Sequence, residues 1–512
     1  MDVRLGVTVI IENPEGEILI VKHTTNNGWS FVSGGIENSE TAIEAAIRET
    51  QEESGIIIDP AKILPTEVYF DFNYRDGRKG RQSIFYYFST TKNTNLNNPK
   101  EITNLAWISP LELRNYLIDK PGLYDLFWKI HHNYHSPIIF TGGGSGGHLA
   151  AATAVIDELK LNYPKISSNI LYVGGIKGMI NDPTPSIESR KVPDLGIKFI
   201  GIRSGKLHRV VNIYMFKLLI GVIGGFIDSL RLLLKYRPVM IFSTGGYVSV
   251  PIVIVGFILG IKIIIHEQTI VSGLANRISA KFATKILISF SNSAKYFSTK
   301  KTILTGNPIQ ASRFNNILPK LMDSSYRTFL ETPSTKPFIF LTGGGLGSHK
   351  LNNWVLNNIL ELSSNYKFLI QTGENELLGD YAKLQTAKET LPLNNQANIF
   401  IIKWFSKEIG YIYSQADLVI CRPGANTVLE LLATNRKAAL VPISWSSANE
   451  QQLNAEYFIA NQTGAIVAET EISTQLYPVI TNLIKLKSKK TEHLVKVNAV
   501  KEITNIILTQ LA

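Results

Sequence analysis

Hydrophobic and polar residues alternate at the start of the chain and follow a different rhythm further on. The opening "MDVRLGVTVIIENPEGEILIV" reads as two strands joined by a Pro-Glu-Gly turn. From Ser136, short apolar strands alternate with helices, the strands falling at 138–140, 170–173, 240–242 and 263–265. This pattern is typical of a parallel sheet with helices on both faces.

The pattern divides the chain into three expected domains. They span residues 1–133, 137–310 and 336–512, and the polar stretch 315–335 separates the last two. Both of these open with a strand, a glycine-rich turn and a helix, as two similar doubly wound domains facing a cleft would. We therefore predict an α/β protein with a smaller N-terminal domain, which fits a length too great for one core.

Composition narrows the class of protein. With 45% hydrophobic and 18% charged residues, the chain is typical of a folded protein. A single cysteine, Cys421, excludes an internal disulfide framework and suits a reducing compartment. The start lacks a signal-peptide pattern, and the apolar runs 218–227 and 250–261 are shorter than the roughly 20 residues of a spanning helix. We therefore expect a cytoplasmic protein.

The net charge of +11 favours anionic partners, namely nucleic acid, a membrane surface or phosphorylated substrates. No aromatic-basic RNA motif or zinc-finger spacing occurs, so we expect no nucleic acid. Basic residues flank the apolar segment "VVNIYMFKLLIGVIGGF". These are Arg203, Lys206, Arg209, Lys217, Arg231, Lys235 and Arg237. Such a segment suits an anionic leaflet, and a buried helix with solvated ends is the alternative.

Acidic residues in the N-terminal part follow the spacing G-x5-E-x7-R-E-U-x-E-E-x-G-U. The matching positions are Gly34, Glu40, Arg48, Glu49, Glu52, Glu53 and Gly55. On a helix, Glu49, Glu52 and Glu53 share one face, where like charges repel unless a cation lies against them. Carboxylate ligands suit Mg²⁺ or Mn²⁺ bound together with substrate phosphates. A solvated acidic helix face is the alternative.

This segment resembles the Nudix box of the Nudix hydrolases, over residues 1 to about 130. The resemblance implies an α/β/α sandwich and metal-dependent hydrolysis of a nucleoside diphosphate compound. By this match Glu49, Glu52 and Glu53 are metal ligands or the base. Arg48 is expected to orient a neighbouring acid, and a carbonyl at the Gly34 turn to join the metal. A nucleotide-sensing module is the alternative, against which the intact acids argue.

A second constellation begins with "TGGGSGGH", which ends at His148 and lies between a strand and a helix. The candidate phosphate-binding residues of this first glycine loop are Gly144, Ser145, Gly146 and Gly147. Backbone N–H groups there would bind a diphosphate. His148 would be a general base for a sugar hydroxyl, unless it only hydrogen-bonds the loop. The motifs that follow are "STGGYVSVP", "IHEQTIVSGLANR", "LTGNPI", "FLTGGGLGS", "ADLVICRPGANTVLELLA" and "ANEQQLNA".

Together these motifs resemble the MurG-type glycosyltransferases, which add N-acetylglucosamine from UDP-GlcNAc to an undecaprenyl-linked muramoyl-pentapeptide in peptidoglycan synthesis. The resemblance implies a GT-B fold with an N-terminal, membrane-facing acceptor domain and a C-terminal donor domain. It also implies an inverting reaction that requires no metal. A lipid-linked acceptor would hold the protein peripherally at the inner leaflet of the cell membrane, on its cytoplasmic face.

The same resemblance assigns candidate donor residues. Glu430 matches the glutamate expected on the ribose, and the others are Arg422, Gly424, Gln451, Gln452 and Asn454. Three further candidates depart from the family pattern. Thr269 replaces an asparagine, Gln310 an arginine and Gly345 a serine. These changes leave open a transferase with a different acceptor.

Overall fold

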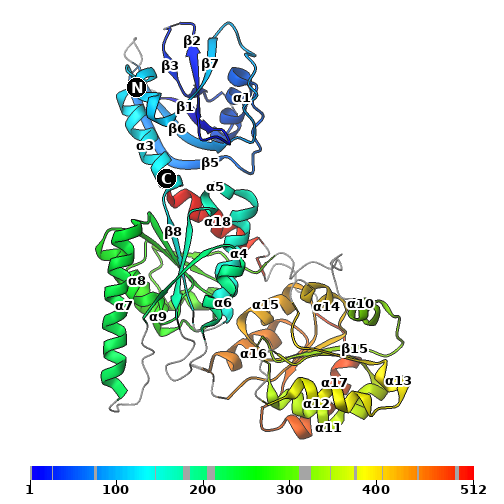
Figure 1. Ribbon diagram of the computed structural model, residues 1–512. Helices are drawn as coiled ribbons and strands as arrows, with labels where there is room; N and C mark the ends of the chain where they lie inside the picture. Colours follow the sequence, from blue (N-terminus) through cyan, green and yellow to red (C-terminus); the bar gives the residue numbers. More distant parts are fainter. Residues whose placement is uncertain are drawn as a thin grey trace.

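The computed structural model has the predicted α/β architecture, built on three sheets (Figure 1). It describes residues 3–25, 27–37, 39–73, 78–143, 146–176, 185–203, 214–310, 324–345, 347–373, 378–405, 408–444, 446, 449–489, 495–496 and 498–511. We call the parts built on these sheets the first, second and third units. Among the described helices, none is both long and apolar enough to cross a membrane.

The first unit is a mixed sheet between helices. Its strands are β1 (Arg4–Glu12), β2 (Ile18–His23), β3 (Trp29–Ser30), β4 (Val32–Gly35), β5 (Leu64–Asn73), β6 (Lys79–Phe88) and β7 (Ile102–Ile108). Its helices are α1 (Ala42–Ser54), α2 (Leu113–Tyr116) and α3 (Pro121–His135), with a 3₁₀ turn η1 (Pro110–Glu112). Alternation along β1 explains the layers: Val9 belongs to the buried cluster that contains Ala45 of α1, and Ile10 to the cluster that contains Phe127 of α3.

The second unit is a parallel sheet in the order β10-β9-β8-β11-β12-β13-β14. Its strands are β8 (Ile138–Thr141), β9 (Ile170–Gly175), β10 (Lys198–Ile202), β11 (Met240–Ser243), β12 (Lys262–Glu267), β13 (Lys285–Ile288) and β14 (Thr302–Leu304). Its helices are α4 (Gly146–Asn162), α5 (Pro164–Ser167), α6 (Ile187–Asp194), α7 (Tyr214–Tyr236), α8 (Ser249–Ile258), α9 (Leu274–Ser279) and the 3₁₀ helix η2 (Ser291–Tyr296). Because the strands run parallel, the loops that follow them gather at one edge.

The third unit repeats this plan, in the order β17-β16-β15-β18-β19-β20. Its strands are β15 (Phe338–Thr342), β16 (Lys367–Gln371), β17 (Ile399–Ile402), β18 (Leu418–Cys421), β19 (Ala438–Leu440) and β20 (Gly464–Ile466). The helices from here to the C-terminus are α10 (Ser324–Glu331), α11 (His349–Asn365), α12 (Asp380–Glu389), α13 (Leu393–Gln396), α14 (Ile409–Gln415), α15 (Ala425–Ala433), α16 (Glu450–Asn461), α17 (Ile472–Lys485) and α18 (Ala499–Leu511).

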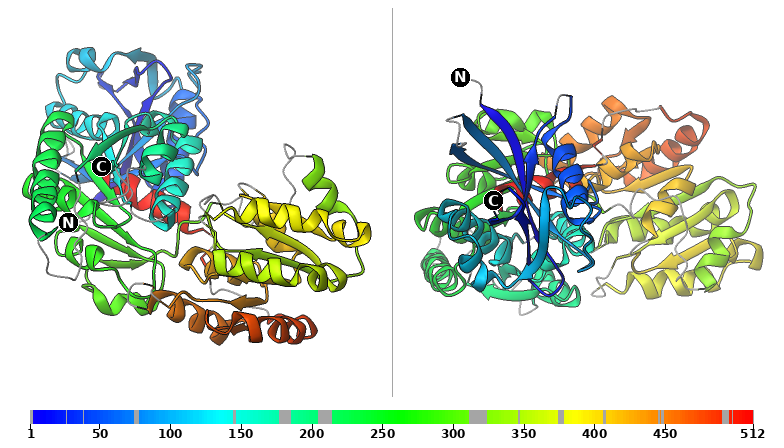
Figure 2. Two further views of the ribbon diagram at one scale, coloured as in Figure 1. Left: turned by 60° about the horizontal axis from the view of Figure 1, so that its bottom comes forward. Right: turned by 90° about the horizontal axis from the view of Figure 1, so that it is seen from above.

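The first unit rests on the second and shares its core (Figures 1 and 2). Only Ser136 and Pro137 separate α3 from β8. The helix α18 returns from the third unit, packs against α4 and also contacts α3 and β5. One continuous cluster of buried residues therefore includes Phe127 of the first unit, Phe140 of the second and Ile507 of α18. The first unit is thus fused to the second through packed apolar surface.

Candidate active sites

The acidic helix α1 has a defined start and end. Thr41 accepts a hydrogen bond from the Glu44 backbone N–H, and the Glu44 side chain accepts one from the Thr41 N–H, which is a capping box. Gly55 ends the helix in the left-handed conformation, with φ of 73°. This places Glu49 and Glu53 on the buried side of α1, while the side chain of Glu52 is about half exposed.

Arg48 ties the acids of α1 to the loop after β4. Its guanidinium donates to Glu40 at 2.7 Å and to the Gly35 carbonyl at 2.9 Å. The same group donates to Glu49 at 2.9 Å and to Glu52 at 3.2 Å. One planar cation therefore fixes the direction of two predicted metal ligands.

Two of the three predicted metal ligands lie in an environment that disfavours their negative charge. Burial raises the pKa of Glu49 despite its bond to Arg48. Burial also raises the pKa of Glu53 to about 8, even though Glu53 accepts the Ser33 N–H at 3.1 Å. A Cβ on Gly34 would lie 1.9 Å from the Glu49 carboxyl carbon, so a larger residue there would have to displace that carboxylate. Among the described residues, the ligand atoms of Glu49, Glu52 and Glu53 do not gather within 4.8 Å of one another as a group of three. Their chemistry, oxygen donors on one helix whose charge is disfavoured by burial, still suits a hard divalent cation.

A second cluster of possible ligands, which we did not anticipate, lies where the first and second units meet. Ligand atoms of Glu12, His131 and His135 lie within 4.8 Å of one another. Glu12, however, accepts hydrogen bonds from Tyr86 at 2.5 Å, His135 at 2.8 Å and Lys165 at 2.6 Å. The ammonium of Lys165 already supplies the positive charge, so we interpret this group as an ion-paired seam between units.

The first glycine loop packs backbone to backbone against the loop after β11. A Cβ on Gly246 would lie 2.2 Å from the Gly143 carbonyl oxygen, which excludes any larger residue. Gly146 and Gly147 begin α4, and His148 lies on its first turn. Gly144 and Ser145 lie outside the described residues. The arrangement directs the N-terminus of α4 toward the strand-end edge, where an anion would bind.

The loop after β12 places Gln268, which was not among the predicted site residues, against the predicted base His148. His148 Nδ1 lies 2.8 Å from Gln268 Oε1. Next to Gln268, the buried Glu267 accepts hydrogen bonds from its own loop: from the Thr269 N–H at 3.0 Å and hydroxyl at 2.7 Å, the Gly273 N–H at 3.2 Å and the Asn276 amide at 3.1 Å. Thr269 lies in this loop of the second unit, and its hydroxyl stabilises the loop by donating to Glu267.

In the third unit, Arg422 holds the strand-end loops. It donates to Ser348 Oγ at 2.7 Å and to the Val441 carbonyl at 2.9 Å, and it pairs with Glu469. Gly345 lies in the preceding glycine loop, and a Cβ on it would lie 3.0 Å from the Trp404 ring. The glycine that replaces the expected serine at this position therefore lies against the bulky ring of Trp404.

A small pocket between the second and third units contains two predicted residues, Gln310 and Glu430. Its lining is Ala150, Pro308, Ile309, Gln310, Asn426 and Glu430. Gln310 donates to Asp157 at 2.7 Å, and Asn307 bridges the units by donating to Asn426 at 2.6 Å. Glu430 is buried, so the structure places it inside this pocket with Gln310.

The predicted amide run is divided among different partners. Gln451 Oε1 accepts the Ile443 N–H at 3.1 Å, and Asn454 donates to the Pro423 carbonyl at 3.0 Å. Gln452 donates to Glu456 at 2.9 Å on the exposed side of α16. Gly424 caps α15 at its N-terminus. Gln451 and Asn454 thus hold the loops around α15, while Gln452 bonds along its own helix.

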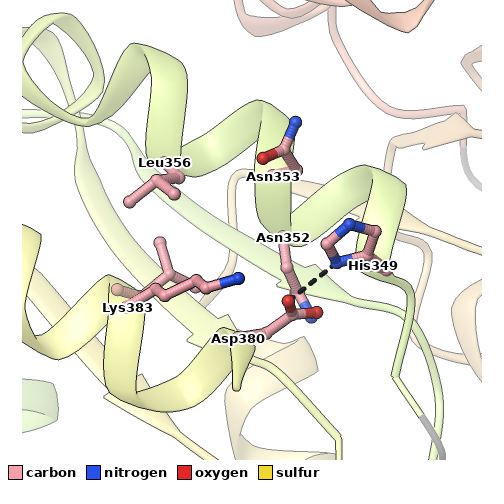
Figure 3. A pocket seen from close by; sticks show the side chains of 7 residues that line it. His349, Asn352, Asn353, Leu356, Asp380 and Lys383 are labelled. Atoms are coloured by element: carbon pink, nitrogen blue, oxygen red, sulfur yellow. Dashed lines mark hydrogen bonds and ion pairs between the residues drawn. The ribbon is translucent and has the colours of Figure 1, made fainter. Parts of the chain in front are cut away.

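A further polar pocket, not predicted from sequence, lies between α11 and α12 (Figure 3). His349, the first residue of α11, lies 2.7 Å from Asp380, which also accepts a hydrogen bond from Asn352 at 2.9 Å. His349 begins α11 directly after the glycine loop that contains Gly345. No sequence motif includes His349, because its partner Asp380 lies on α12, some thirty residues further along the chain.

Comparisons with known proteins cover all three units. The NUDIX domain model matches residues 2–127. The N-terminal domain model of glycosyltransferase family 28 matches residues 138–288, and the C-terminal domain model of that family matches residues 338–507.

Relatives match most of the chain. UDP-N-acetylglucosamine--N-acetylmuramyl-(pentapeptide) pyrophosphoryl-undecaprenol N-acetylglucosamine transferase of Clostridium kluyveri is 34% identical over 377 residues, covering 72% of this chain and 97% of that protein. The protein of the same name from Treponema denticola is 33% identical over 347 residues, covering 66% of this chain and 86% of its own. The crystal structure of Acinetobacter baumannii MurG, 20% identical with a TM-score of 0.52, covers 73% of this chain and 99% of its own, and shares the fold.

Proposed function

Because this chain belongs to glycosyltransferase family 28 and carries a NUDIX domain at its N-terminal end, we propose that it combines two reactions. The second and third units transfer N-acetylglucosamine from UDP-GlcNAc to a lipid-linked muramoyl-peptide in peptidoglycan synthesis. The first unit hydrolyses a nucleoside diphosphate compound with the help of a divalent metal. The observation that carries the transferase is 34% identity, over 377 residues, to a relative with that name.

In the transfer, the second unit holds the acceptor and the third holds the donor. His148 takes the proton of the acceptor hydroxyl as the oxygen attacks the anomeric carbon, and UDP leaves from the opposite face. The N-terminus of α4 and the adjoining loop amides stabilise phosphate charge near the attacking group. Donor contacts come from the loops that Arg422, Gln451 and Asn454 hold, with Glu430 on the ribose side.

In the hydrolysis, the carboxylates of Glu49, Glu52 and Glu53 would hold Mg²⁺ or Mn²⁺. The bound metal would neutralise the diphosphate and lower the pKa of a water. Arg48 holds the carboxylates of Glu49 and Glu52 through hydrogen bonds from its guanidinium. Because they are already oriented, they need not be ordered during turnover. Glu49 and Glu53, whose pKa values burial raises, would be held in their charged form by such a cation.

The membrane partner is supported by one face of α7. Its exposed residues include the apolar Ile223, Ile227, Leu230 and Leu234, which recur at helical spacing on one side. Arg231 and Lys235 are exposed among them, and the adjoining end of α8 exposes the apolar Phe257, Ile258 and Leu259. Lys206 and Arg209 of the predicted basic segment lie outside the described residues, as does the side chain of Lys217.

An apolar stripe with basic neighbours would bind peripherally to an anionic inner leaflet and bring the lipid-linked acceptor to the cleft. Sedimentation with vesicles tests this part of the proposal. The full chain should bind vesicles containing phosphatidylglycerol and release them at high salt, and equal binding to neutral vesicles would contradict it.

The transferase proposal is tested by incubating the full chain with radiolabelled UDP-GlcNAc and the lipid-linked muramoyl-pentapeptide. Transfer of the sugar to lipid supports it, and release of UDP without any labelled lipid counts against it. The hydrolase proposal is tested with a panel of nucleoside diphosphate compounds, with Mg²⁺ and with chelator. Hydrolysis that is unaffected by chelator would contradict a metal-dependent site.

A second candidate function keeps the donor and changes the acceptor. It is favoured by Thr269, Gln310 and Gly345, whose residue types depart from the family pattern. In this chain Gln310 bonds to Asp157, and Gly345 lies against Trp404. The same assay decides, because transfer to another lipid or glycoside, with none to the muramoyl-peptide, selects this alternative.

A further inference from the structure

The side chain of Gln268 has only one possible orientation. Its Nε2 lies 2.8 Å from the backbone carbonyl oxygen of His266, and a carbonyl can only accept a hydrogen bond. The amide nitrogen must therefore face that carbonyl. This leaves the amide oxygen facing His148 Nδ1 at 2.8 Å. Gln268 is 2% exposed, so solvent does not compete for either group.

His266 agrees with this orientation from the other side. Its Nε2 lies 3.0 Å from the Gly306 carbonyl oxygen and must donate to it. The ring is fully buried, and burial lowers its pKa to about 4, so at neutral pH it carries a single proton, on Nε2. Its Nδ1 is then an acceptor for Gln268 Nε2, which lies 3.0 Å away.

Two backbone carbonyls thus determine the direction of every hydrogen bond in the chain Gly306–His266–Gln268–His148. An amide oxygen facing His148 Nδ1 requires a proton on that nitrogen. In the neutral ring, which is the form that accepts a proton, the lone pair then lies on Nε2. After proton uptake the Nδ1–H still donates to Gln268, so no hydrogen bond has to reverse during the reaction.

We propose that Gln268 and His266 are positioning residues that fix His148 in the Nδ1-protonated form and present Nε2 as its base. This inference rests on the proposed transferase function for the role of His148, and it adds the residues that set which nitrogen reacts. The role is that of the carboxylate in a serine protease triad, here performed by a neutral amide. No net charge is buried in doing so.

The first test is the protonation state of His148 in the full chain, which does not depend on activity. With ¹⁵N-labelled histidine, the signals missing from His148→Ala identify the ring. We expect the neutral wild-type ring to show a protonated Nδ1 and an unprotonated Nε2. In Gln268→Leu we expect a mixture of the Nδ1-protonated and Nε2-protonated forms of the ring. A wild-type ring protonated on Nε2 would overturn the inference.

The second test is a double-mutant comparison of sugar transfer. Gln268→Leu should lower kcat by about 10- to 100-fold with little change in KM for UDP-GlcNAc, because it weakens a general base and not donor binding. The control Gln385→Leu removes a similar amide, which bonds Tyr381 in the third unit at 3.0 Å, and should retain activity. In the His148→Ala background, Gln268→Leu should add no further loss.

Different results would overturn the positioning role of Gln268 and the proposed transferase function. A full additional loss in the His148→Ala background would show that Gln268 acts independently of His148 and would overturn the inference. A wild-type chain that transfers no sugar to any acceptor would instead overturn the proposed transferase. The ¹⁵N spectrum would still decide which nitrogen of His148 carries the proton.

Discussion

The ion pair between Glu12 and Lys165 joins the first and second units, and its removal should destabilise the whole chain. Glu12 is 1% exposed, and Lys165 Nζ lies 2.6 Å from its carboxylate. Burial raises the pKa of Glu12, but hydrogen bonds and charge from His135, Lys165 and Tyr86 outweigh it and lower the pKa from 4.5 to about 2. That difference corresponds to about 3 kcal/mol of stability.

Lys165→Met leaves the buried carboxylate without its ammonium partner. His135 and Tyr86 remain, and Lys165 is partly exposed, so the expected loss in free energy of unfolding is about 2–3 kcal/mol, at or slightly below the usual range for breaking a buried pair. Urea unfolding, followed by circular dichroism at pH 7, measures it. Glu12→Gln combined with Lys165→Met should recover part of the loss, because no unpaired charge is then buried.

The sign of the pH dependence follows from the lowered pKa. The stabilisation by Glu12 is present above pH 4.5 and is lost as the pH falls toward 2, so the effect of Lys165→Met should shrink over that range. The matched control is Lys92→Met, which removes an exposed 2.8 Å pair with Glu17 in the first unit. It should barely shift the urea midpoint of unfolding. Equal shifts for the two variants at pH 7 would refute the reasoning.

Three further predictions concern the proposed activities and the membrane. Glu52→Gln should reduce metal-dependent hydrolysis by at least about 10-fold, whereas Glu37→Gln, at an exposed site on the same acidic segment, should not; phosphate release at saturating Mg²⁺ measures both. Gly34→Ala should weaken Mg²⁺ binding in calorimetry, because the new Cβ would lie 1.9 Å from the Glu49 carboxyl carbon, and unchanged affinity would contradict this placement. Leu234→Glu should lower binding to anionic vesicles several-fold without changing transfer to a detergent-soluble acceptor.

The parts of the structure that depend on local pattern were predictable. The helix expected to carry Glu49, Glu52 and Glu53 on one face is α1, which runs from Ala42 to Ser54. It was predictable because its capping residues and its acidic face lie within one short stretch. The doubly wound plan of the second and third units is confirmed, because strand, glycine loop and helix follow one another along the chain.

The parts that depend on distant contacts were not predictable. The helix α18 lies in the expected third domain, yet it packs against α4 of the second unit. Glu12 reads in sequence as a strand-end acid, and only the fold shows Lys165 against it. In the sequence Gln268 is only a position in the motif "IHEQTIVSGLANR", and the structure shows it between His148 and His266. In each case the partner lies more than a hundred residues away or arrives through tertiary packing.

The most direct test of the two-reaction account is sugar transfer measured side by side in three full-length proteins. Wild type, His148→Ala and Glu52→Gln are each incubated with radiolabelled UDP-GlcNAc and the lipid-linked muramoyl-pentapeptide in anionic vesicles. The account predicts labelled lipid from wild type and Glu52→Gln, and a loss of at least about 100-fold for His148→Ala. Undiminished transfer by His148→Ala would contradict it.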